Sequence, residues 1–366
     1  MPNSRQHFVP QVYLKSWIGA NSTNDAANKL ATQLYLFNKD CSFIGPRSTD
    51  TVCYGKHTYT VDWEHSFIAE KCPEIGKDFA ERISEILIER NVDAFFNGKK
   101  LITIEDYASV LRLLDKWEFY QKDGTLATNK RIKNQINSIH SYVIEKSFCG
   151  FVETHFESII GNFLNEVENA QCNIYSKCRV IQEKTAKAAF EILILMACRN
   201  PLFDCFGLYP SIVNMYFDPI IDLNADDSEF LKHAAQTMKR GVWLTEIYKI
   251  LYNEKNNISD VVWKQFKKMC KFLLFHVEDG ADYGFITSDN PAVYYINNIE
   301  IENHNGIYFP LSPDYLLMAA RSSDGAINEI DYRTASIQDV RLLNRIIRSA
   351  ADEQIISRQK NIYYIL

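Results

Sequence analysis

The chain has 366 residues, of which 46% are hydrophobic and 13% aromatic. This is enough apolar material for a large core, so disorder is not expected. The net charge of -6 provides no overall positive field and therefore does not favour nonspecific binding to nucleic acid. Charge and composition alone indicate neither a partner nor an oligomeric state.

The cysteines indicate a reducing compartment. There are nine of them, scattered along the chain, and no C-x-x-C pair occurs. A tetrahedral zinc site usually draws on closely spaced ligand pairs, so the spacing also argues against zinc. The first residues lack the apolar stretch of a signal peptide, and the longest apolar run, around 192–198, is too short to span a bilayer. We expect a cytoplasmic protein without a membrane segment.

The N-terminal part of the chain predicts a short helix and a small sheet. Pro10 suits the first turn of a helix, although no Ser, Thr, Asp or Asn cap precedes it. Residues 33–37 and 57–61 have the β-branched and aromatic content of strands and are expected to pair. From Trp63 the apolar residues follow a helical period to about Ile86, with a break near Pro73.

The middle of the chain is predicted to be mainly helical, because its apolar residues recur with a period near 3.6. Expected helices are 103–121, 129–146, 151–167, 183–199 and 228–252. Strand signals return afterwards at 272–277, 306–313 and 316–320, before a last helix at 336–352. Pro310 and Pro313 predict that the strand at 306–313 lies at a sheet edge.

These elements predict an α+β fold, in which a mainly helical middle packs on a sheet built from N-terminal and C-terminal segments. We expect a single large domain over residues 1–366. A helical subdomain, residues 64–260, would be inserted between the sheet-forming segments 1–63 and 261–366.

A candidate site centres on Phe285–Pro291, where a strand signal runs directly into polar turn-forming residues. Pro291 keeps Asn290 out of the helical region, and Asp289 can bond nearby amides. Ser288, Asp289 and Asn290 are thereby expected at a strand end, which is a common position for functional groups.

Three further residues have a functional and a structural interpretation. His7 precedes the uncapped helix start, where it would either accompany a bound anion or pin the N-terminus to a loop. Arg199 ends an apolar helix, where it would either neutralise the helix C-terminus or offer its guanidinium to a carboxylate or phosphate. Glu64 lies near the change from sheet to helix and is more simply explained by the helix dipole.

Strong catalytic signatures are absent. The sequence has no phosphate-binding loop, G-x-G-x-x-G, H-E-x-x-H or G-x-S-x-G motif. An Asp-rich segment at 222–227 superficially matches a calcium loop, but it lacks the Gly at position six and ends on His233. No cofactor is evident from these motifs.

Five short motifs spread over nearly the whole chain resemble domain-of-unknown-function family 4238, an uncharacterised and mostly bacterial family. They are His7-x-Val9-Pro10-Gln11-x-Tyr13-Leu14, Arg199-x-Pro201, Thr287-Ser288-Asp289-Asn290-Pro291, Pro310-Leu311-Ser312-Pro313 and Asn344. The usual R-T-P of the family is Arg199-Asn200-Pro201 here. The resemblance implies no reaction, but it implies that the following residues form one cluster: His7, Gln11, Glu64, Arg199, Asp289, Asn290 and Asn344.

Two functions fit such a cluster. The first is a hydrolase acting on a nucleotide or nucleic-acid phosphodiester, in the setting of bacterial defence. His7 or Asp289 would be the general base and Arg199 would stabilise negative charge. The substrate would be oriented by Gln11, Ser288, Asn290 and Asn344. The second is a non-catalytic sensor or protein-interaction module, in which the same cluster locks the N-terminal helix onto the C-terminal strands.

A divalent metal is a variant of the first hypothesis. The oxygen ligands of Asp289 and Glu64, together with His7, are candidate ligands for Mg²⁺ or Mn²⁺. The two hypotheses differ in burial: catalysis predicts that His7 and Asp289 line an accessible cleft, whereas a structural role predicts that both are sealed and mutually satisfied.

Overall fold

The computed structural model describes residues 5–18, 33–56, 73–137, 154–172, 178–199, 258–295, 306–321 and 328–366. Contacts divide the chain into two compact units. The first unit comprises Met1–Gln6, Lys56–Cys149 and Pro210–Ile258, and the second comprises His7–Gly55, Gly150–Tyr209 and Ser259–Leu366. The predicted inserted segment, 64–260, therefore contributes to both units, and the division into domains stays a prediction.

The structure confirms the α+β class. The described α-helices are α1 Gln11–Leu14, α3 Pro73–Arg90, α4 Ile104–Val110, α5 Asn129–Asn137, α7 Thr154–Asn169, α8 Glu183–Arg199, α11 Ile258–Met269 and α12 Ile337–Ala350. The first nine strands are β1 Arg5–His7, β2 Gln33–Asn38, β3 Phe43–Ser48, β4 Tyr54–Lys56, β5 Val92–Phe96, β6 Lys99–Leu101, β7 Trp117–Gln121, β8 Arg179–Val180 and β9 Cys270–Val277. The C-terminal strands are β10 Thr287–Ser288, β11 Val293–Tyr295, β12 Gly306–Pro310, β13 Tyr315–Arg321, β14 Glu329–Ala335 and β15 Gln354–Ser357.

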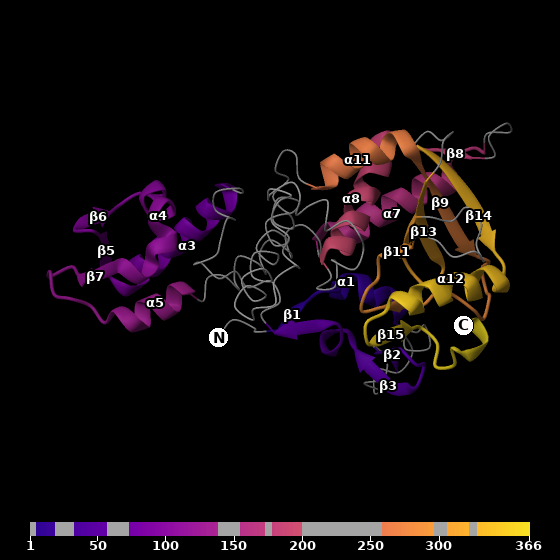
Figure 1. Ribbon diagram of the computed structural model, residues 1–366, viewed down its shortest axis with the longest axis horizontal. Coiled ribbons are helices and arrows are strands. Elements are labelled where there is room, and N and C mark those ends of the chain that lie inside the picture. Colours follow the sequence, from indigo (N-terminus) through magenta and orange to yellow (C-terminus); the bar gives the residue numbers. More distant parts are fainter. Residues whose placement is uncertain are drawn as a thin grey trace, which may run out of the picture. The chain divides into compact units, whose positions relative to one another are not determined.

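A six-stranded sheet with helices on both faces forms the main layer of the second unit (Figure 1). Its strand order is β11-β12-β13-β9-β14-β8, and only the β14–β9 pair is parallel among the pairs described. Alternate residues of β9 point to opposite faces. Leu273 and Phe275 join the core under α12, whereas Phe272 contacts the aromatic rings of α7, α8 and α11.

A second, four-stranded sheet joins the two ends of the chain. Its order is β10-β15-β2-β3, and β15 pairs with β2 so that Ile355 lies opposite Phe37. This agrees with the expected sheet contribution from both ends. The predicted strand 57–61 lies outside the described residues, and the neighbours of β2 are β3 and β15.

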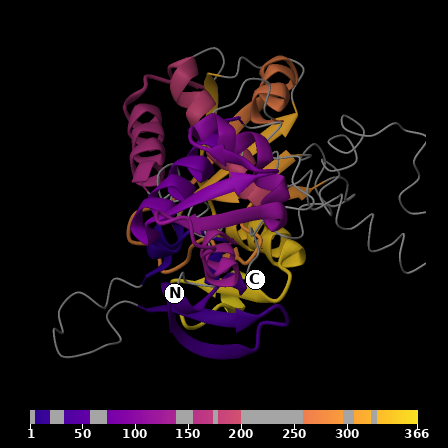
Figure 2. The ribbon, with the colours of Figure 1, turned by 90° about the vertical axis from the view of Figure 1, so that its left-hand side faces the viewer.

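The first unit contains a small sheet that the sequence did not predict. Strands β6, β5 and β7 pair in that order. They are the purple strands in Figure 2, where the purple helices of the same unit lie beside them. The prediction of a helix reaching Gln121 is wrong, because α4 ends at Val110 and residues 117–121 form β7. Trp117 and Phe119 are buried there while Glu118 between them is exposed, which is the alternation of a half-buried strand.

One proline prediction also needs correction. β12 is not an edge strand, since it pairs with β11 on one side and β13 on the other. Pro310 is tolerated because it is the last residue of β12, where its missing N–H falls at the end of the ladder. The predicted break near Pro73 stays a prediction, because α3 is described from Pro73 onward and residues 57–72 lie outside the described residues.

Candidate functional site

The carboxylate of Asp289 binds the turn that connects α12 to β15. The backbone N–H of Asp352 donates to Oδ1 at 2.9 Å, and those of Glu353 and Gln354 donate to Oδ2 at 2.7 and 2.9 Å. The backbone N–H of Asp289 donates in turn to the carbonyl of Gln354. Asp289 is 5% exposed, so its carboxylate is sealed inside the protein and both of its oxygens are engaged.

Ser288 and Asn290 complete this turn. Ser288 Oγ donates to the Asn290 carbonyl at 2.8 Å and accepts from the Asn290 N–H at 3.1 Å. Asn290 Nδ2 donates to the carbonyl of Ala350, the last residue of α12, at 3.0 Å. A carbonyl at a helix C-terminus has no partner within its helix, so Asn290 caps α12. Both side chains are buried and serve the backbone.

Asn344 lies on α12 and is fully buried. Its Oδ1 accepts the Ile286 N–H at 3.0 Å, and its Nδ2 donates to the carbonyls of Gly284 and Ile365 at 3.1 and 3.0 Å. One carboxamide thus ties the segment that leads into β10 to the last residues of the chain. This leaves little capacity for a substrate, since both hydrogens and the oxygen are used.

His7, Gln11 and Arg199 form a second group at the start of α1. His7 Nδ1 lies 3.2 Å from the carbonyl of Val52, which can only accept, so Nδ1 carries the proton. Nε2 then accepts from Gln11 Nε2 at 3.0 Å. The buried guanidinium of Arg199 donates to the backbone carbonyl of His7. His7 itself is half-buried, and both ring nitrogens are occupied.

Helix α1 connects the two groups. The hydroxyl of Tyr13 lies 2.6 Å from Thr287 Oγ1 and donates to the Pro310 carbonyl at 2.8 Å. Trp17 lies in the 3₁₀ turn Lys15–Trp17 that follows α1, and its Nε1 donates to the carbonyl of Phe285 at 3.2 Å. The N-terminal helix and the turn after it are therefore fastened to β10, to the segment before β10 and to the end of β12.

Burial changes the acid–base behaviour of Asp289. Loss of solvent raises the pKa of its carboxyl above the ordinary value, and the three backbone N–H donors from Glu353, Asp352 and Gln354 oppose that rise. The net direction is upward, so burial outweighs the hydrogen bonds. The nearby carboxylate of Asp352 adds a smaller upward contribution.

The structure describes seven of the eight predicted site residues; Glu64 lies outside the described residues. Within the described part of the chain, no three His, Cys, Asp or Glu side chains converge in a way that could hold a metal ion. The Mg²⁺ or Mn²⁺ hypothesis, which included Glu64, stays untested.

Another polar group, which no sequence motif predicted, lies on the six-stranded sheet near the end of α7. The His276 ring lies 4.9 Å from the Tyr315 ring and 5.9 Å from the Tyr332 ring, and Arg179 lies over Tyr332 at 3.9 Å. The Tyr315 hydroxyl donates to the Glu168 carboxylate. Burial, then this carboxylate, raises the pKa of Tyr315. Only the polar His276 in a strand of apolar residues signalled this group in the sequence.

Comparison with known proteins places the chain in a family whose function is not established. The match covers residues 5–361, which is nearly the whole chain, so the chain belongs to this family. The family is described as Protein of unknown function (DUF4238). No curated protein and no solved structure matches the chain.

Within the described residues, no helix has both the length and the apolar character needed to cross a bilayer.

Proposed function

We propose that the signature residues of this family form a structural clamp, and that the protein is a non-catalytic sensor or protein-interaction module. The observation that supports this most is the state of Asp289. Asp289 is 5% exposed, and its carboxylate accepts three backbone N–H groups. A general base needs an oxygen or nitrogen that can reach a substrate proton, and Asp289 offers none.

The state of His7 supports the same proposal. A catalytic imidazole in this tautomer would use Nε2 as the base, but Nε2 already receives the Gln11 carboxamide. Asn344 and Ser288, two of the four predicted substrate-binding residues, bond to backbone groups of their own unit. The clamp joins α1, α12 and the two sheets into one scaffold.

The test compares stability and catalysis in the same variants. Wild type, His7→Gln and Asp289→Asn are assayed on single-stranded RNA, single-stranded DNA and a chromogenic phosphodiester, and their unfolding free energies are measured with denaturant. We expect no turnover by the wild type and a less stable Asp289→Asn variant. Turnover that is lost in a His7→Gln variant of normal stability would overturn the clamp proposal.

A hydrolase of nucleotide or nucleic-acid phosphodiesters is the second candidate function, favoured by the His276 group. An imidazole, a carboxylate and a guanidinium lie together there, which are the groups needed for proton transfer and charge stabilisation. His276→Gln should then abolish turnover of the same substrates, while His7→Gln should retain it. Equal activity of wild type and His276→Gln would remove this candidate.

A cytoplasmic location is part of the proposal. The buried cysteines Cys41 and Cys53 are free thiols, as expected in a reducing compartment. Fractionation of cells that express a tagged chain tests this, and recovery in a membrane or secreted fraction would contradict it.

A further inference from the structure

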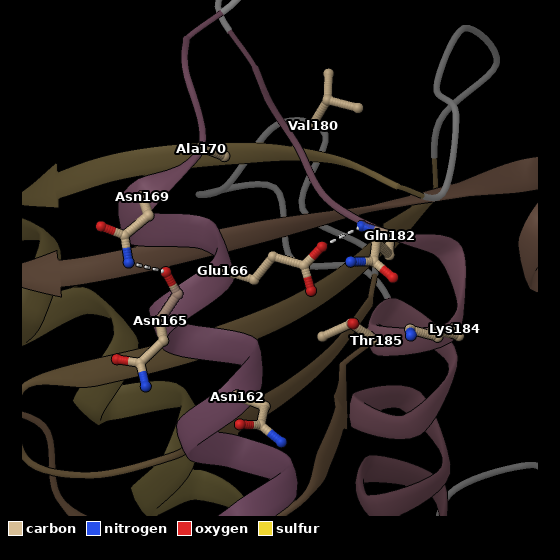
Figure 3. Close-up of a pocket in the computed structure, with 9 residues that line it drawn as sticks. All are labelled: Asn162, Asn165, Glu166, Asn169, Ala170, Val180, Gln182, Lys184 and Thr185. Carbon is tan, nitrogen blue, oxygen red and sulfur yellow. Dashed lines mark hydrogen bonds between the residues drawn. The ribbon is translucent and has the colours of Figure 1, made fainter.

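A polar groove of about 580 Å³ lies between α7 and the start of α8 (Figure 3). Four carboxamide side chains line it, from Asn162, Asn165, Asn169 and Gln182. The three asparagines follow one another along one face of α7, at positions i, i+3 and i+7, and all three are exposed. The opposite face of α7 is packed into the core through Phe163 and Val167.

Asparagine is a poor choice for these positions. In a helix interior it is less favourable than alanine by about 0.6 kcal/mol, because its side chain competes for backbone groups. Asn162 and Asn165 lie inside a helix of 16 residues. Within the described residues their carboxamides make no hydrogen bond, and Asn169 bonds only to the carbonyl of Asn165. A residue that has a low helix propensity and makes no stabilising contact in the fold indicates a functional position.

The walls of the groove are held in place. The carboxylate of Glu166 accepts the backbone N–H of Gln182, the residue before α8, and so fixes the start of α8 against α7. In Figure 3 this bond spans the middle of the groove, and Thr185 and Lys184 lie on the α8 side. The groove is thus formed before any ligand arrives.

The spacing of the carboxamides matches an extended polypeptide. Seven residues of helix rise about 10 Å, and three residues of an extended chain cover about the same length. A carboxamide offers one acceptor and two hydrogens, so it can bond both the C=O and the N–H of a backbone. The lining carries one carboxylate, Glu166, and one ammonium, Lys184. The net charge of the lining is therefore zero, and the groove does not attract a polyanion electrostatically.

We propose that this groove binds an extended, uncharged segment of a protein partner, with Asn162, Asn165 and Asn169 holding the backbone of that segment. The proposal rests on the proposed function as an interaction module and names its partner class. Affinity comes from the main chain of the bound segment, as in other modes of extended-peptide recognition.

The experiment is a selection from a displayed library of random short peptides on the full chain. The triple variant Asn162→Ala, Asn165→Ala, Asn169→Ala serves for counter-selection. The matched control is Asn134→Ala, an exposed helical asparagine on α5. We expect peptides that bind wild type and Asn134→Ala equally and the triple variant at least about tenfold more weakly, through the loss of backbone hydrogen bonds. The residues of a selected peptide form two alternating sets. N-methylation of one of these two sets should abolish binding.

Stability separates a binding role from a structural one. Asn162→Ala and Asn165→Ala should raise the thermal midpoint, because alanine is the better helix former. A lowered midpoint would show that these side chains support the fold and would overturn the proposal. So would a library that yields no peptide, or peptides that bind the triple variant as well as the wild type.

Parallel binding assays with neutral oligosaccharides and single-stranded RNA identify a different occupant. Binding of either that the triple variant loses would assign the groove to that ligand and overturn the peptide proposal. Selected peptides that bind elsewhere on the protein would refute the proposal that the groove binds a peptide, but they would still support the proposed interaction module. Phosphodiester turnover by the wild type would refute the proposed function itself.

Discussion

Asp289 and Gln354 are joined twice through the backbone of the turn after α12. The Gln354 N–H donates to Asp289 Oδ2 at 2.9 Å, and the Asp289 N–H donates to the Gln354 carbonyl at 3.1 Å. The second bond extends the β10–β15 pairing, and the first adds a side-chain acceptor to the same turn. The residue at the centre of the signature motif therefore holds the fold where the last helix turns back into the sheet.

Replacing Asp289 tests this role. Asp289→Ala leaves three backbone N–H groups without their acceptor, and we expect a loss of about 3–5 kcal/mol in the free energy of unfolding. Denaturant titration measures this. Asp279→Ala is the control, because the Asp279 side chain is fully exposed and should change stability by less than about 0.5 kcal/mol. An equal effect of both variants would contradict the clamp.

The pH dependence of stability should carry the signature of Asp289. Its folded pKa lies above the unfolded value, so between the two values the folded state holds more protons. The contribution of Asp289 to stability is then fully present below the unfolded pKa and decreases as the pH rises through the folded pKa. Asp289→Asn should remove this slope. NMR of the Asp289 carboxyl carbon shows whether this residue causes the pH dependence of stability. Titration of Asp289 below its ordinary pKa would refute the prediction.

Asp106 in the first unit should show the opposite sign. Its carboxylate accepts the N–H groups of Thr103 and Ile102 at the start of α4, and these bonds lower its pKa to about 2. The stabilisation is present above the unfolded pKa and is lost as the pH falls towards 2. In the wild type, we expect the α4 amides to lose hydrogen-exchange protection as the pH falls from the unfolded pKa towards 2. In Asp106→Asn, the protection of the same amides should not change over this pH range.

Asn344 tests the inner part of the clamp. Asn344→Ala removes the partners of one N–H and two carbonyls in a fully buried position, so we expect a loss of about 2–4 kcal/mol in the free energy of unfolding. Asn344→Asp keeps an acceptor but cannot donate, and it buries a charge, so it should be at least as destabilising. Asn134→Ala is the exposed control. A stable Asn344→Ala variant would show that these bonds contribute little.

Two glycines provide a matched pair for the packing of the second unit. A Cβ at Gly306 of β12 would lie 2.4 Å from the carbonyl oxygen of Ala319 in β13, so Gly306→Ala should destabilise by about 1–3 kcal/mol. A Cβ at Gly161 of α7 meets nothing within 4 Å. Gly161→Ala should therefore stabilise by about 0.5–1 kcal/mol, as helix propensity dictates. Thermal unfolding compares them, and a destabilised Gly161→Ala variant would contradict the α7 packing.

Periodicity and strand signals predicted the α+β class. The helix 183–199 coincides with α8, and the strand 272–277 lies inside β9, because a long apolar run and alternating burial are properties of neighbouring residues. Such local signals failed at 117–121, where Trp117 and Phe119 suit a helix face as well as a strand face. Pairing with β5 selects the strand.

The sequence by itself determined which polar residues to examine, since turn chemistry marked Ser288, Asp289 and Asn290 at a strand end. Only the tertiary structure decided what they contact. The partners of Asp289 are backbone amides more than 60 residues further along the chain, and backbone amides are present at every non-proline position, so they leave no mark in a sequence. Burial decided the rest, because whether a carboxylate meets solvent or a turn depends on how α12 and β15 close over it.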